Sequence, residues 1–422
     1  MSTENKNYAL PIAMMFALFF MIAFVTGLPS PMGVIVAKQF GATNFESQLG
    51  FLGNFLAYAF MGIPAGIMLK KFGYKKTALS AIGVGFVGVA VQFLSGQVGL
   101  FAIYLVGTFI SGFSMCMLNT VVNPMLNTLG GGGNSGNRLL QFGGSINSIG
   151  ATITPMLVGS LMGAEAGRTI EKANPALFLA LGIFALAFVV LSFVKIPEPH
   201  LETATERKVK HSHSPLSFRH FIFGAIAIFI YVGIEIGIPS TANLFMTASK
   251  SASNAGLGIE ATTAGSIVGI YWLLMLVGRL IGASIGAKVS SKTMMIAVSS
   301  LGLVLILAAI FSPINSTVTL PHFGTQVPLS IVFLVLCGLC TSIMWGGVFN
   351  LAVEGLGKYT AAGAGIFMVM VCGGGIVPLI QGFVSDHFGY LNSYWVMFAC
   401  IAYMMWYALI GCKNVNKDIP VE

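Results

Sequence analysis

The most restrictive feature of this chain is how little charge it carries. Lys, Arg, Asp and Glu make up 8% of its 422 residues, whereas 56% are hydrophobic. A soluble domain carries roughly 25% charged residues. The composition therefore excludes a soluble multidomain enzyme and a disordered chain, and its 52 glycines are typical of membrane helices that pack closely. We predict an all-α polytopic membrane protein.

Apolar runs long enough to cross a bilayer recur along the whole chain. A membrane-spanning helix needs about 20 mostly apolar residues, and we predict twelve such helices. They cover residues 8–37, 47–69, 77–95, 98–128, 138–162, 175–195, 220–246, 262–288, 293–311, 328–356, 360–384 and 394–411. Prolines interrupt some of these runs, at Pro29, Pro31, Pro124 and Pro239, and the backbone groups that such breaks free are expected to face a cavity or neighbouring helices.

Lys and Arg are distributed unevenly between the predicted loops. With the N-terminus in the cytoplasm, 16 of them lie on the cytoplasmic side and 4 on the outer side, and Arg279 lies within a span. The outer four are Lys38, Arg168, Lys172 and Lys250. This asymmetry follows the positive-inside rule. It places both termini in the cytoplasm and explains the net charge of +8 without a nucleic-acid partner.

The densest charge in the chain lies between the sixth and seventh spans. Residues 198–219 hold seven charged residues together with two prolines, which is typical of a solvated linker. We predict an N-terminal six-helix bundle at 1–196, a charged cytoplasmic linker at 197–219 and a C-terminal six-helix bundle at 220–422. The CxxC pair of Cys337 and Cys340 lies in a span without a second pair, so we expect no metal site.

The two predicted bundles share short motifs in the same order. Gly, Gly, Lys and Thr of residues 62–77 recur in 278–293 at a constant offset of 216. Further matches link 27–30 with 237–240, 153–159 with 376–382, and Asn123 with Asn350. Ordered matches near half the chain length indicate a duplication. A duplicated membrane protein of this kind suggests rocking of two halves around a site near the bilayer midplane.

Two six-span halves joined by a charged linker resemble the major facilitator superfamily. Residues 66–76 are similar to its signature loop, with Lys70 in place of the usual Asp, and residues 351–360 (LAVEGLGKYT) resemble a segment of its fucose:proton symporter family. Segments within 119–124, 147–155, 231–238 and 271–282 resemble that family's fourth, fifth, seventh and eighth spans. The resemblance implies twelve helices in two pseudo-symmetric bundles and import of fucose, glucose, galactose or N-acetylglucosamine.

The chain departs from this family at positions that bear on its chemistry. The family's first span reads Leu-Asn-Asp, and its Asp is a proton-coupling candidate, but here the sequence is Leu28-Pro29-Ser30. Asn119 stands where the fucose symporter has Glu. Gly144 stands where the fifth-span motif has Gln, although Gln141 lies one turn earlier. The resemblance therefore does not carry substrate and coupling over unchanged, and it leaves open whether Ser30 and Asn119 replace the missing acids.

Glu235 is the only acid placed deep in a predicted span. A charge at the bilayer centre costs at least ~2.5–3.5 kcal/mol, so such a residue is a functional candidate facing a cavity. Four roles are open. Glu235 can carry the coupling proton, because burial disfavours a charged carboxylate and alternation would change its burial. It can bind sodium with carbonyls near the break at Pro239, bind a sugar hydroxyl, or make a structural polar contact. Of these we prefer the proton, and then sodium.

A sugar site needs hydrogen-bonding side chains and aromatic faces. Intramembrane amides and aromatics are the candidates, and each is also explicable as a helix-packing contact. The proposed substrate-binding residues are Asn119, Asn123, Gln141, Asn147, Asn243, Tyr271, Trp272, Trp345, Asn350 and Gln381. Tyr271 and Trp272 are adjacent, so at most one of them points squarely inward. Arg279 and Glu354, toward the cytoplasmic side, are expected to form a gate or an ion pair.

The sequence as a whole predicts a secondary active importer of a neutral sugar (a hexose, deoxyhexose or amino-sugar derivative) that works by alternating access. We expect coupling to a proton gradient in preference to sodium, no cofactor, no enzymatic activity, and a monomer in a bacterial inner membrane. A proton antiporter that exports drugs or metabolites and an uncoupled sugar uniporter are the alternatives. A membrane enzyme or sensor is disfavoured, because the sequence shows no catalytic cluster and no soluble output domain.

Overall fold

A computed structural model describes residues 8–130, 133–161, 170–198, 213–251, 254–285, 289–320, 324–416 and 418–420. Its first part contains α1 (Ala9–Gly27), α2 (Pro29–Phe40), α3 (Asn44–Ser47), α4 (Leu49–Phe72), α5 (Tyr74–Val98), α6 (Phe101–Leu129), α7 (Gly133–Leu161), η1 (Ile170–Ala173) and α8 (Asn174–Phe193). Its second part contains η3 (Pro215–Ser217), α9 (Arg219–Thr247), α10 (Ala261–Ile285), α11 (Ser291–Phe311), β1 (Thr317–Leu320), β2 (Thr325–Pro328), α12 (Leu329–Thr341), α13 (Met344–Val353), η4 (Gly357–Tyr359), α14 (Thr360–Met370), α15 (Gly373–Phe388), α16 (Tyr390–Trp406) and the π-helical turn η5 (Tyr407–Gly411).

The helices are long and apolar enough to form a membrane bundle. Among the described residues, eleven helical segments have the length and hydropathy of a membrane span. The predicted span that is not among them is 138–162, which corresponds to α7. This helix has 29 residues, but it is less apolar because it carries Asn137, Gln141, Asn147 and several serines and glycines. The predicted all-helical membrane fold is therefore confirmed, with α7 as its most polar long helix.

The helix breaks agree only in part with those expected at prolines. Helix α1 gives way to α2 at Leu28, directly before Pro29. By contrast, Pro124 lies inside the continuous helix α6 and Pro239 inside the continuous helix α9, so the expectation of a break at these two positions is wrong. The tenth and eleventh predicted spans are each divided, between α12 and α13 and between α14 and α15.

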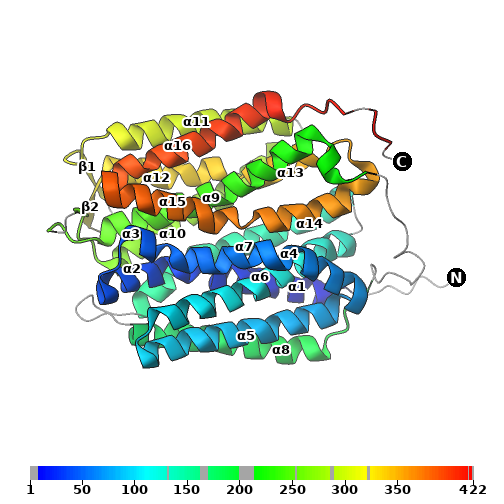
Figure 1. Cartoon of the computed structure of the whole chain (residues 1–422), viewed down its shortest axis with the longest axis horizontal. Coiled ribbons are helices and arrows are strands. Elements are labelled where there is room, and N and C mark those ends of the chain that lie inside the picture. Colours follow the sequence, from blue (N-terminus) through cyan, green and yellow to red (C-terminus); the bar gives the residue numbers. More distant parts are fainter. Residues whose placement is uncertain are drawn as a thin grey trace.

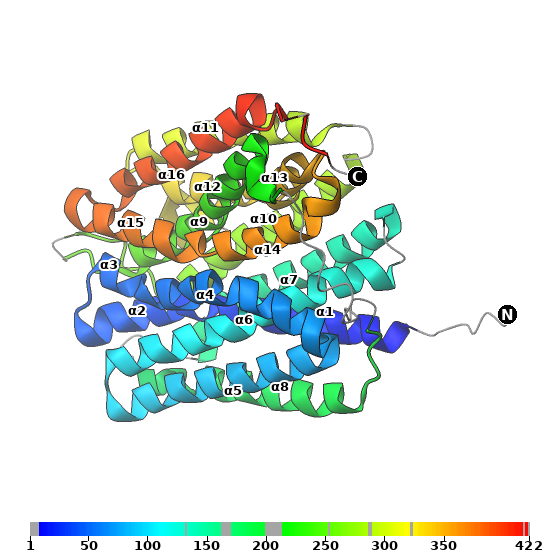
Figure 2. The ribbon, with the colours of Figure 1, turned by 45° about the vertical axis from the view of Figure 1, so that its right-hand side comes forward.

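The helices gather in two halves that lie side by side. Figure 2 shows the blue-to-green helices α1–α8 in one half and the green-to-red helices α9–α16 in the other, with the long axes running in the same general direction. Most of the predicted linker, residues 199–212, lies outside the described residues. Each of the two sequence repeats inferred above therefore lies in one of these two groups of helices.

The bundle has two distinct ends. One end carries the turn between α4 and α5 with Lys70, Lys71, Lys75 and Lys76, and we call it the basic end. The other carries the antiparallel hairpin of β1 and β2, in which Thr317 pairs with Pro328, and we call it the hairpin end. Figure 1 shows the hairpin at the left of the bundle and the start of α1 and the end of α16 at the right.

Candidate functional site

A cavity of about 740 Å³ lies between the two halves. This volume is within the roughly 300–1,000 Å³ of small-molecule sites. Its wall includes polar and aromatic side chains from both halves, namely Thr26, Ser30, Tyr58, Asn119, Asn123, Asn147, Tyr231, Glu235, Ser240, Trp272, Arg279, Ser291, Ser342, Trp345 and Asn350. The cavity therefore has contacts with both halves, as a site that serves alternating access requires.

The cavity extends from the middle of the bundle toward the basic end. Ser291 and Met294, at the start of α11, line it together with Asn350 near the end of α13, and the side chain of Asn350 is exposed. At the hairpin end the halves are in direct contact. Gln48 Nε2 donates to Ser240 Oγ at 3.2 Å, and a Cβ atom on Gly265 of α10 would lie 2.6 Å from the carbonyl oxygen of Pro155 on α7. The structure is thus closed at the hairpin end.

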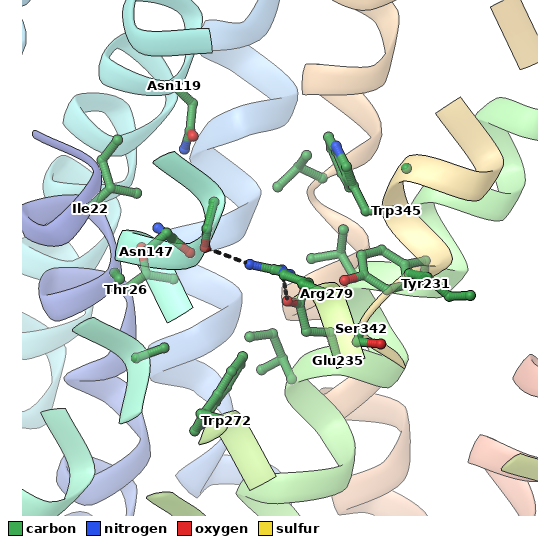
Figure 3. Close-up of a pocket in the computed structure, with 18 of the residues that line it drawn as sticks. Ile22, Thr26, Asn119, Asn147, Tyr231, Glu235, Trp272, Arg279, Ser342 and Trp345 are labelled. Carbon is green, nitrogen blue, oxygen red and sulfur yellow. Dashed lines mark hydrogen bonds and ion pairs between the residues drawn. The ribbon is translucent and has the colours of Figure 1, made fainter. Parts of the chain in front are cut away.

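Glu235 lies near the middle of α9 and faces this cavity (Figure 3). Its Oε1 atom is 3.6 Å from Nη2 of Arg279 on α10, and the two side chains are only 16% and 17% exposed. A partly buried carboxylate needs a counter-charge to remain ionised in such a place. The arginine supplies it.

Arg279 also reaches across to the other half. Its Nη1 atom donates to the carbonyl oxygen of Gly144 at 2.9 Å and to Ser148 Oγ at 2.7 Å, both on α7. One guanidinium thus pairs with an acid of its own half and hydrogen-bonds a helix of the other half. The planar fork of arginine allows these contacts at once, which a lysine ammonium does not reproduce.

The expected pairing of Arg279 with Glu354 is wrong. Glu354 follows α13 at the basic end, and its side chain is exposed. The contact it makes there uses the backbone, since its carbonyl oxygen is 2.9 Å from Nε2 of the buried His220. Spacing along the chain placed Arg279 and Glu354 on the same side of the membrane, but Arg279 points toward the middle of the bundle instead.

Pro239 changes the backbone around Glu235 without breaking the helix. A proline inside a helix has no N–H for the carbonyl four residues earlier, and here that carbonyl belongs to Glu235. The hydroxyl of Tyr271 donates to this oxygen at 3.3 Å and also lies 3.1 Å from Thr341 Oγ1. Tyr271 therefore donates the hydrogen bond that the carbonyl of Glu235 lacks within its helix. Both residues belong to the second half, and the bond fixes the backbone at Glu235. Tyr271 does not line the cavity, whereas its neighbour Trp272 does.

Three of the predicted amides form the cavity wall on the side of the first half. Asn119 Nδ2 donates to Tyr58 Oη at 2.9 Å, and Asn123 Nδ2 donates to the Asn119 carbonyl at 2.8 Å. Asn147 Nδ2 donates to the Phe19 carbonyl at 3.1 Å. Each amide is thus oriented by a protein partner, and each lines the cavity.

Aromatic side chains line the cavity on the side of the second half. Figure 3 shows Trp345 and Trp272 on opposite sides of the Glu235–Arg279 pair, with Tyr231 beside it. The rings of Tyr231 and Trp345 have centroids 6.1 Å apart. The hydroxyl of Tyr231 is buried beside the ion pair and interacts with the side chains of both Glu235 and Arg279.

The structure places the remaining predicted residues elsewhere or at the margin. Asn243 is buried near the hairpin end, where its Nδ2 lies 3.4 Å from Ser30 Oγ. Gln381 is fully buried between α15 and α16, 3.5 Å from Ser393 Oγ, and like Asn243 it does not line the cavity. Asn350 lines the cavity toward the basic end. The side chain of Gln141 lies outside the described part of the chain.

Several cavity residues were not among the predicted site residues. Tyr58, Tyr231, Ser148 and Ser342 take part in the cavity wall or in the bonds around it. Hydroxyl side chains are common in membrane helices, so the sequence offers little reason to select these. Tyr231 is the exception, because it lies one helical turn before Glu235 and hence on the same face. Among the described residues, no group of three or more His, Cys, Asp or Glu comes together as a metal site would require.

Comparison with known proteins adds an independent line of evidence. The family model of the Major Facilitator Superfamily matches residues 14–378. The glucose/galactose transporter of Brucella abortus (strain 9-941) is 28% identical over 98% of this chain and 97% of its own. The L-fucose-proton symporter of Escherichia coli K12 is 25% identical over 92% and 89%. The crystal structure of FucP, a Major Facilitator Superfamily transporter in the outward conformation, has a TM-score of 0.69 at 22% identity and covers 96% of this chain and all of its own.

Proposed function

This chain belongs to the Major Facilitator Superfamily, and on that premise we propose that it imports a neutral sugar across a bacterial inner membrane in symport with protons. The substrate class is a hexose, a deoxyhexose or an amino-sugar derivative. The relatives named for glucose, galactose and fucose support this class over nearly the whole chain length. The Lys and Arg distribution supports the basic end as the cytoplasmic end.

The chemistry of the cavity supports a sugar. Asn119, Asn123 and Asn147 offer amide groups on one wall, and Trp272 and Trp345 offer aromatic faces on the other. Amides match the donors and acceptors of sugar hydroxyls, and aromatic rings cover the apolar faces of a sugar ring. Arg279 is the only Lys or Arg among the described residues that line the cavity, and Glu235 balances it, which favours a neutral substrate over an anionic one.

One observation carries the coupling proposal: Arg279 contacts Glu235 in its own half and Ser148 in the other half. When Glu235 is ionised, its carboxylate shares the guanidinium with α7. When a proton binds at a carboxylate oxygen of Glu235, the attraction to Arg279 weakens and the guanidinium is free to interact more fully with α7. The protonation of one atom thereby alters the contact between the halves, which is the link that a symporter needs.

Sodium is less well supported as the coupling ion. A sodium site at Glu235 was expected to use carbonyls freed by a helix break at Pro239, but α9 is continuous there. The one carbonyl that Pro239 frees is occupied by the hydroxyl of Tyr271. A cation at the carboxylate would also lie beside Arg279, at a cost in electrostatic free energy.

Transport in proteoliposomes tests the proposal. The purified protein would be offered labelled glucose, galactose, fucose and N-acetylglucosamine, with an inward proton gradient or an inward sodium gradient imposed separately. We expect accumulation of at least one sugar above equilibrium with the proton gradient, and its loss when a protonophore is added. Absence of uptake of every sugar contradicts the substrate class. Accumulation that follows sodium alone contradicts the proton, and equilibration without accumulation identifies a uniporter.

A further inference from the structure

The contact between the halves at the hairpin end is built around one carboxylate. Asp386, near the end of α15, accepts the backbone N–H of Asn44 on Oδ1 at 2.8 Å and the backbone N–H of Phe45 on Oδ2 at 2.9 Å. Both donors belong to α3 of the other half. Each carboxylate oxygen thus accepts one bond, and the two bonds fix the distance between α3 and α15 at this point.

Among the described residues, the same two donors have no partner within their own half. The first N–H groups of a helix have no intrahelical acceptor. In α3, Thr43 and Glu46 form a capping box, in which Thr43 Oγ1 accepts the N–H of Glu46 at 3.1 Å and Glu46 Oε2 accepts the N–H of Thr43 at 2.8 Å. The N–H groups of Asn44 and Phe45 remain, and Asp386 accepts both.

Further bonds surround this carboxylate. Tyr390 Oη donates to Asn44 Oδ1 at 2.9 Å, and Asn44 Nδ2 donates to Ser385 Oγ at 3.3 Å. Asn44, Ser385 and Tyr390 are all buried. The side chain of Asn44 is therefore held from both sides by the second half.

Close backbone approach makes these bonds possible. A Cβ atom on Gly382 would lie 2.8 Å from the carbonyl oxygen of Asn44 and 3.0 Å from Cα of Phe45. These neighbours are backbone atoms, so they cannot rotate away. Any larger residue at this position would push α3 and α15 apart, one turn from Asp386.

We propose that Asp386 is the positioning residue of an outer gate: its carboxylate, bound to the backbone of Asn44 and Phe45, holds the hairpin end closed while the cavity is open at the basic end. Hydrogen bonds with a charged acceptor are stronger than neutral ones. When the halves separate, the carboxylate of Asp386 and the N–H groups of α3 bind water instead, so the gate is reversible. This inference rests on the alternating access proposed above, but it is independent of the sugar and of the coupling ion.

Thiol labelling from the outer side tests the gate. Thr26 lines the cavity on α1, so a cysteine introduced there (Thr26→Cys), in a variant with the six native cysteines replaced by serine, reports access to the cavity. A membrane-impermeant thiol reagent would be added to intact cells without any sugar. Asp386→Asn keeps the shape of the side chain but presents an amide donor to the N–H groups. We expect it to speed labelling about tenfold, which corresponds to about 1.4 kcal/mol.

Two further variants make the test specific. Glu46→Gln removes a nearby charge from α3, yet it preserves the capping box and touches no bond between the halves, so labelling is expected to stay within twofold of the parent. Gly382→Ala is expected to speed labelling by separating the backbones. The proposal is overturned if Asp386→Asn labels at the rate of Glu46→Gln, whatever Gly382→Ala does. Because no sugar is present, a protein that fails to transport sugars still gives a result here.

Discussion

Arg279 on α10 donates a hydrogen bond to Ser148 on α7 at 2.7 Å, and its other terminal nitrogen faces Glu235 at 3.6 Å. These contacts place a basic side chain between an acid of its own half and a helix of the opposite half. The cavity surrounds this position and supplies the polar groups on either side (Figure 3). The predictions below follow from that arrangement.

Removing the guanidinium alone should destabilise the protein more than removing the whole ion pair. Arg279→Met leaves Glu235 partly buried without a counter-charge, and breaking a fully buried pair costs roughly 3–5 kcal/mol. Because both side chains are about one-sixth exposed, we expect about 2 kcal/mol. The double variant Glu235→Gln/Arg279→Met should recover at least half of the loss in apparent melting temperature in detergent. Additive losses in the two single variants and the double variant would contradict a direct interaction.

The neighbouring aromatics Tyr271 and Trp272 should respond differently to substitution. Trp272 lines the cavity, so Trp272→Ala should raise the KM for sugar uptake about tenfold. Tyr271→Phe removes the bonds to the Glu235 carbonyl and to Thr341. It should lower stability by about 1 kcal/mol and leave the KM within threefold of the wild type. Initial rates of uptake together with thermal melting separate the two effects, and a large rise in KM for Tyr271→Phe alone would reverse the assignment.

The predicted amide residues also divide into those that line the cavity and those that do not, and substitutions in the two groups should differ in their effect on the KM. Asn147 faces the cavity and Gln381 is fully buried away from it. Asn147→Leu should raise the sugar KM three- to tenfold, as expected for the loss of one hydrogen bond worth about 0.7–1.4 kcal/mol. Gln381→Leu, the matched amide-to-leucine change, should leave the KM unchanged. Equal KM values for wild type and Asn147→Leu would show that this amide serves packing only.

Much of the architecture could be predicted from the sequence, because the bilayer imposes a strong length and polarity requirement on each span. Helices α5, α9 and α11 are mostly apolar and were predicted within a few residues. Helix α7 was also predicted, although the Asn, Gln and Ser residues in its sequence lower its hydropathy. The importance of Glu235 was equally visible, since an acid in the middle of a span is costly unless it has a function.

Contacts between helices could not be predicted with the same success. Arg279 was assigned to Glu354 because both lie toward the cytoplasmic side, whereas the side chain in fact turns toward Glu235 and α7. Asn243 and Gln381 have the residue type of a sugar ligand, yet the rotation of their helices buries them in protein. Asp386 was not among the predicted site residues. Its partners are backbone N–H groups of α3, which no side-chain pattern reveals.

The most direct test of the account is proton-driven sugar accumulation by Glu235→Gln in proteoliposomes, measured beside sugar counterflow in the same vesicles. Glutamine keeps the size of the side chain but cannot bind and release a proton, so we expect accumulation to fall to the equilibrium level while counterflow continues. Glu260→Gln, which changes an exposed acid at the hairpin end, serves as the control and should accumulate sugar like the wild type. Accumulation at the wild-type level by Glu235→Gln would contradict the assignment of Glu235 as the coupling acid.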